Sequence, residues 1–172
     1  MNKLKVEKEI WLRENPKPWD EEIEKEYHRI FSTKVERWLD SGMGECRLRN
    51  REAREVVVAS MQHGEVERYE LHCFAIMPNH VHLLFTPSKG WTLETIVGSW
   101  KKYTARAING MESRGGSFWA KSYFDRLIRD PGHLANVIRY IHRNPMKAGL
   151  SDQESLVWES DRVKALNLKG LE

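Results

Sequence analysis

The stretch Leu71–Thr86, LHCFAIMPNHVHLLFT, decides the fold class, because two strand-like segments meet there across Pro78-Asn79. The odd-numbered positions from Tyr69 to Met77 form one apolar face, and the alternation continues over residues 80–86. Since successive side chains of a strand point to opposite faces, we predict a β-hairpin over residues 66–86 with a very short connection.

Helical periodicity surrounds this hairpin. Apolar residues recur at helical spacing in residues 1–41 (broken at NPKPW), in 51–63, from Thr92 to about Ile108, and in 131–144. Asp130 is a good N-cap for the last of these helices, and we expect Pro145 to end it. Residues 45–48 and 123–129 are predicted to be short strands. This order of elements predicts an α+β fold, in which helices pack against an antiparallel sheet.

The composition limits the class of protein. The chain has 172 residues, enough for one domain of ordinary size, and two cysteines without metal or redox spacing. No apolar run approaches the roughly 18 residues that span a bilayer. The N-terminal sequence MNKLKVEKEIWLRE is too charged for a signal peptide. We therefore expect a cytoplasmic, reduced protein that does not enter the membrane.

The charge is unevenly distributed. Residues 1–45 contain nine Lys/Arg and eleven Asp/Glu, whereas residues 101–147 contain ten Lys/Arg and three Asp/Glu, a net charge of +7. Trp and Tyr residues lie among these basic residues, as in proteins that bind polyanions. A solvated basic surface is the simpler explanation of the charge alone.

His80 and His82 are the candidate metal ligands. Both lie in the second predicted strand at positions i and i+2, so both imidazoles point to the same face. A structural histidine pair is the alternative. On the last predicted helix, Tyr140 and Asn144 are neighbours on one flank of the apolar stripe, with Arg139 and Arg143 further towards solvent. If the four residues meet, they form a metal site with a phenol beside it. The remaining histidines lack such spacing and are interpreted as structural or surface residues.

The candidate DNA contacts follow from the basic segment. Trp100, Tyr103, Trp119 and Tyr123 are candidates to stack on bases, although Trp100 fits the core better. The residues expected to hold a phosphate backbone are Lys101, Lys102, Arg106, Arg126, Arg129, Arg139, Arg143 and Lys147.

Four blocks in order carry a family resemblance: MPNHVHLLF, SWKKYTARAIN, FWAKSYFDRLIRD and VIRYIHRNPMKAGL. They resemble the REP-associated tyrosine transposases, which are single-tyrosine members of the HUH endonuclease superfamily. The resemblance extends from about Trp11 to Leu150. It implies a ferredoxin-like α+β fold and cleavage and joining of single-stranded hairpin DNA through a 5′-phosphotyrosine, with Mg²⁺ or Mn²⁺ as cofactor.

By the same resemblance, His80 and His82 match the metal ligands, Tyr140 matches the nucleophile and Asn144 matches the third protein ligand. It also predicts an N-terminal helical insertion at 1–44, a catalytic domain at 45–150 and a C-terminal tail at 151–172. Relatives occur as monomers and as homodimers, and either state is expected here.

One departure from the family pattern affects the expected activity. Family members begin with a strand that pairs within the central sheet, and residues 1–10 are helix-like instead. Without this strand, one edge of the central sheet would be unpaired. We therefore expect either a decayed copy of the transposase or an open reading frame whose start was assigned too late. A structured-DNA-binding protein with impaired catalysis is therefore the alternative function. A zinc hydrolase that uses His80 and His82 ranks last, because a third ligand and a general base are not evident.

Overall fold

The structure is a computed structural model that describes residues 2–16, 18–40, 42–121 and 123–168. The chain divides into two compact units, Met1–Gly44 and Glu45–Glu172, and each unit is described by itself. Where the structure describes the chain, none of its helices is long and apolar enough to cross a bilayer.

The first unit is helical, as predicted. Its elements are α1 (Asn2–Glu14), α2 (Glu21–Tyr27), the π-helix η1 (His28–Ser32) and α3 (Thr33–Asp40). The Asp20 side chain starts α2 by accepting a hydrogen bond from the Ile23 amide at 2.8 Å. Aromatic rings form its core: Trp11 lies 5.3 Å from Trp19 and 5.9 Å from the buried Phe31, measured between ring centroids. Edge-to-face contacts of this kind stabilise the small helical unit beyond the apolar area that they bury.

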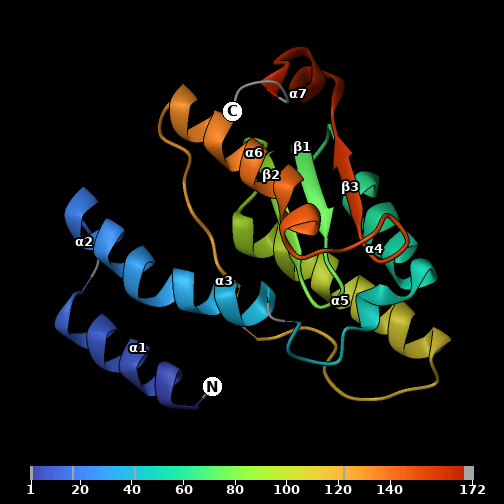
Figure 1. The fold of residues 1–172 in the computed structure, drawn as a ribbon, viewed down its shortest axis with the longest axis horizontal. Helices are drawn as coiled ribbons and strands as arrows, with labels where there is room; N and C mark the ends of the chain where they lie inside the picture. The colour runs from blue at the N-terminus through green and yellow to red at the C-terminus, as the bar shows by residue number, and fades with distance from the viewer. Residues whose placement is uncertain (1, 17, 41, 122, 169–172) are drawn as a thin grey trace. The chain divides into compact units, whose positions relative to one another are not determined.

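The second unit is built on a three-stranded antiparallel sheet in the order β2-β1-β3. Its strands are β1 (Tyr69–Ile76), β2 (Val81–Pro87) and β3 (Leu156–Glu159). Its helices are the 3-10 turn η2 (Arg47–Arg49), α4 (Arg51–His63), α5 (Leu93–Met111), α6 (Pro131–Lys147) and α7 (Asp161–Ala165). The predicted hairpin and the predicted α+β class are confirmed (Figure 1).

Helices cover both faces of this sheet. Phe74 and Ile76 of β1 pack in one cluster with residues of α4 and α5, including Trp100. Cys73 and Ala75, on the other face, pack with Ile138 and Ile141 of α6. The α5 layer and the α6 layer therefore lie on opposite sides of β1 (Figure 1). Because helices cover both faces of β1, most of its side chains are buried.

A β-bulge at His72 makes the two halves of β1 present their side chains differently from the prediction. Leu71 pairs with Phe85 but Cys73 pairs with Leu84, so one extra residue stands in β1. An extra residue reverses the alternation of side chains beyond it. Leu71 accordingly packs on the α5 side, whereas Cys73 packs on the α6 side. The prediction of a single apolar face from Tyr69 to Met77 was wrong for this reason.

Two predicted strands are absent from the structure. Residues 45–48 overlap the 3-10 turn Arg47–Arg49, and residues 123–129 have no strand pairing. The chain leading to 123–129 is instead fixed by Lys101, whose Nζ donates to the carbonyl oxygens of Ala120 and Lys121. A short segment becomes a strand only when a neighbouring strand completes its β-ladder, and the local sequence alone does not provide one.

The predicted C-terminal tail contributes to the sheet. Its segment Leu156–Glu159 forms β3 and pairs with Cys73–Ile76 of β1, and α7 follows. In the described part of residues 1–44 there is no strand, as expected, but β1 still has a partner on each side along this stretch. Residues 169–172 of the predicted tail lie outside the described residues.

The two cysteines should differ sharply in reactivity. Cys73 is fully buried, and this burial raises the pKa of its thiol to about 12, whereas Cys46 is partly exposed. Because the thiolate is the reactive form, we expect one fast thiol at pH 8 with a thiol reagent and a second only in denaturant. Cys46→Ser should remove the fast thiol. Two fast thiols in the native protein would contradict this packing of β1.

Candidate metal and tyrosine site

The hairpin turn places the two candidate metal ligands. The Met77 amide donates to the His80 carbonyl at 2.9 Å across Pro78-Asn79, so His80 immediately precedes β2 and His82 lies within it. His82 stands opposite Ala75, whose small side chain faces the α6 layer. The sequence of the turn thus brings both imidazoles to the side of the sheet that α6 covers.

The two imidazoles meet through their Nε2 atoms. His80 Nε2 lies 2.8 Å from His82 Nε2, with the ring centroids 4.5 Å apart and the planes nearly perpendicular. Burial lowers the pKa of His80 to about 4. The pKa of His82 is lowered to about 3, mainly by burial and also by the charge of His80. Both rings are therefore neutral at pH 7, which is the form that can bind a metal.

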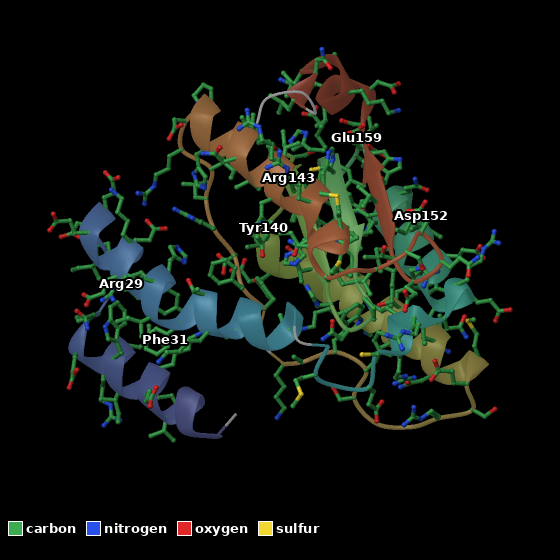
Figure 2. All side chains as sticks on the ribbon, in the orientation of Figure 1. Arg29, Phe31, Tyr140, Arg143, Asp152 and Glu159 are labelled. Atoms are coloured by element: carbon green, nitrogen blue, oxygen red, sulfur yellow. The ribbon has the colours of Figure 1, made fainter. Side chains whose placement is uncertain are left out.

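Helix α6 carries Tyr140 to this pair. The Asp130 side chain caps the helix by accepting from the His133 amide at 2.8 Å. Ile138 and Ile141 fix the helix against the sheet. Tyr140 then lies edge-to-face with His82, 5.3 Å between centroids. The structure thus brings the phenol next to the imidazole pair, and Figure 2 shows Tyr140 and Arg143 on this helix.

Asn144 lies one helical turn beyond Tyr140 and is only 2% exposed. Its Nδ2 donates to the Tyr140 carbonyl at 3.3 Å, so the carbonyl oxygen of the amide is the group left to serve as a ligand. The predicted end of the helix at Pro145 was wrong: α6 continues to Lys147 with Pro145 buried inside it. The Ala148 amide donates to the backbone carbonyl oxygen of Asn144 at 3.1 Å. This helical hydrogen bond spans Pro145 and lets the helix continue past it. This extra turn places Lys147 Nζ 5.6 Å from the centre of the Tyr140 ring.

The kinds of donor atom in these side chains are ones that a divalent cation accepts. Within the described ranges, no group of three or more His, Cys, Asp and Glu side chains is placed to hold a metal. Two neutral imidazoles with an amide oxygen would therefore be the protein's share of a coordination shell that solvent or phosphate oxygens complete. Among the residues that the structure describes, no third His or carboxylate ligand for a zinc hydrolase site joins His80 and His82.

The predicted DNA-contact residues divide between the two layers. Lys101, Lys102 and Arg106 belong to α5, whereas Arg139, Arg143 and Lys147 belong to α6 and share the layer of Tyr140. Arg126 and Arg129 are exposed in the segment that joins the layers. The candidates that share the layer of Tyr140 therefore belong to α6, and one of them, Lys147, lies near its ring.

The aromatic candidates also separate by environment. Trp100 is buried and its Nε1 donates to the Tyr69 hydroxyl. The Trp119 Nε1 donates to Thr104 Oγ1 at 2.8 Å, and its half-buried ring packs in the α5 layer. Tyr103 and Tyr123 are exposed, at 60% and 39%.

Two polar contacts at this site were not found from the sequence. Asn79 Oδ1 lies 2.7 Å from His80 Nδ1. His142 Nε2 of α6 lies 3.1 Å from Glu159 Oε2 of β3, and this contact joins the helix that carries Tyr140 to the edge strand. The position of Asn79 beside His80 was a signal available in the sequence. Glu159 gave none, because its strand was not predicted.

Comparisons with known proteins identify the family of the chain. The family described as "Transposase IS200 like" matches residues 22–144. A curated protein of Haemophilus influenzae with the provisional name REP-associated tyrosine transposase is 29% identical over 91 residues, which is 47% of this chain and 52% of that protein. The match therefore spans about half the length of this relative. No solved structure matches the chain. The family match covers more than half of the sequence, and the chain belongs to the IS200-like transposase family.

Proposed function

We infer that this transposase cleaves and rejoins single-stranded DNA with Tyr140 as the nucleophile and a divalent cation at His80, His82 and Asn144. The observation that carries this proposal is the edge-to-face contact between Tyr140 and His82, whose Nε2 meets that of His80. A phenol beside two neutral imidazoles and a buried amide has the groups that a metal-assisted phosphoryl transfer needs.

The reaction follows from these groups. The Tyr140 oxygen attacks a backbone phosphorus, a tyrosine–phosphate ester forms, and the bond to the 3′ oxygen breaks. The phenolic proton passes to solvent and the leaving 3′ oxygen takes one up, so the step needs no further reactant. A phenol has a pKa of about 10 and is a weak nucleophile at pH 7. Mg²⁺ or Mn²⁺ would supply Lewis acidity at the phosphate. Attack of a 3′-hydroxyl on the ester reverses the step and rejoins a strand without ATP.

The positive charge of α6 supports a polyanionic substrate at this site. Arg143 and Lys147 are exposed on the helix that carries Tyr140, and Lys147 lies near its ring. Charges of this kind hold phosphates without reading sequence, so they fit a substrate chosen by its shape. A single strand with a hairpin is such a substrate.

Metal removal provides the test. Incubating the protein with a panel of single-stranded hairpin DNAs and Mn²⁺ should give a covalent protein–DNA adduct, visible on a denaturing gel. EDTA should abolish it and excess Mn²⁺ should restore it. If the DNA is labelled 3′ of the cut, the label should remain on the protein, because the tyrosine ester holds the 5′ phosphate of that fragment. Fully paired duplexes of the same sequence serve as the control.

The alternative is a protein that grips structured DNA without cutting it. It is favoured by the lack of a strand in the described part of residues 1–44, where the family has its first strand. Hairpin binding with no adduct in Mg²⁺, Mn²⁺ or Co²⁺ would support this alternative and contradict the enzyme. Binding that does not weaken with salt would contradict both, because phosphate contacts release counterions.

A further inference from the structure

The side chain of Asn79 contacts the ring of His80 on the side away from His82. The Asn79 side-chain oxygen lies 2.7 Å from His80 Nδ1. A carbonyl oxygen can only accept a hydrogen bond, so Nδ1 must be the protonated nitrogen of this ring. A neutral imidazole has one ring proton, and His80 Nε2 therefore presents a lone pair towards His82.

The same reasoning gives the state of His82 in the metal-free protein. The two Nε2 atoms are 2.8 Å apart, which is a hydrogen-bond distance. Because His80 Nε2 has a lone pair, the proton between the rings belongs to His82 Nε2. His80 is therefore ready to bind a cation, whereas His82 is held in the tautomer that cannot.

We propose that Asn79 is a positioning residue that holds His80 Nε2 open for a divalent cation, and that binding moves the His82 proton from Nε2 to Nδ1. The proposal rests on the inferred function only in taking this histidine pair as the metal site. No proton is gained or lost by the pair, because His82 exchanges one neutral tautomer for the other. Partners outside the ligand shell commonly act in this way by fixing ring orientation and tautomer.

Asn79→Ala tests the role directly. Asn79 does not have a positive φ, so alanine can replace it without backbone strain. Without the acceptor at Nδ1, the two arrangements of the shared proton become similar in free energy. We expect a mixture of His80 tautomers and roughly ten-fold to a hundred-fold weaker Mn²⁺ binding.

Two measurements are made on the full chain in the absence of DNA. Long-range ¹H–¹⁵N NMR of the metal-free protein reports which nitrogen of each histidine is protonated, and calorimetry at pH 7 reports Mn²⁺ affinity. Asn79→Asp, whose carboxylate also only accepts, should keep the His80 Nδ1 proton and retain Mn²⁺ binding. Asn136→Ala, an exposed asparagine of α6, is the matched control and should change neither readout.

The result that overturns the proposal is a wild-type His80 protonated at Nε2, or an Asn79→Ala variant with unchanged tautomers and unchanged Mn²⁺ affinity. Thermal melting separates a folding defect from a local one. The proposed nuclease fails in a different way, when Mn²⁺ binds normally but no DNA adduct forms.

Discussion

Replacing Tyr140 with phenylalanine should abolish the covalent adduct with single-stranded DNA, by more than about a thousand-fold in rate. Phenylalanine keeps the ring that packs edge-to-face against His82 but has no oxygen to attack phosphorus. DNA affinity should therefore stay within about two-fold of the wild type, since the phosphate contacts lie on other side chains. Adduct yield on a denaturing gel and affinity from fluorescence anisotropy measure the two quantities separately.

Tyr103→Phe is the matched control for this prediction. Tyr103 lies on α5, in the opposite layer from Tyr140, and is 60% exposed. The change removes the same atom from the same residue type without touching the proposed site. Adduct formation should be unaffected in this variant. If the adduct persists in Tyr140→Phe, or disappears in Tyr103→Phe, Tyr140 is not the nucleophile and the proposed mechanism is wrong.

The site was more predictable than the sheet that supports it. A two-residue spacing puts two strand side chains on one face whatever surrounds them, and a four-residue spacing puts Tyr140 and Asn144 on one flank of a helix. These rules are local and needed no knowledge of the fold. The structure brings Tyr140 to His82 as the predicted faces require. The chemical roles of these residues remain predictions.

The errors in the sheet have non-local causes. The bulge at His72 depends on how β1 pairs with β2, which alternation within β1 cannot reveal. Residues 123–129 were predicted to be a short strand but have no pairing partner in the structure. Conversely, Leu156–Glu159 is too short to be recognised alone and becomes β3 because β1 offers it an edge. Whether each of these segments forms a regular strand depends on its pairing with distant parts of the chain, and not on its local propensity.

Phe74→Ala should lower the free energy of unfolding of the second unit by about 3–5 kcal/mol. Phe74 is fully buried in β1 and stacks on Trp158 of β3 at 5.3 Å between centroids. Removing its ring leaves a cavity between the sheet and the α5 layer. Urea denaturation followed by circular dichroism measures the change. Val157→Ala, at a 43% exposed position of β3, is the control and should cost less than about 1 kcal/mol.

A double-mutant cycle between Phe74 and Trp158 asks whether β3 is an energetic part of the sheet. If the stacked rings stabilise each other, the double variant should be less destabilised than the sum of the two single variants by about 0.5–1.5 kcal/mol. Zero coupling with a small effect of Trp158→Ala would mean that this contact of β3 contributes little to the stability of the sheet. Measurable coupling would instead link the C-terminal strand to the helix that presents Tyr140. Truncations before Leu156 should then impair DNA cleavage through the position of α6, although they remove no proposed ligand.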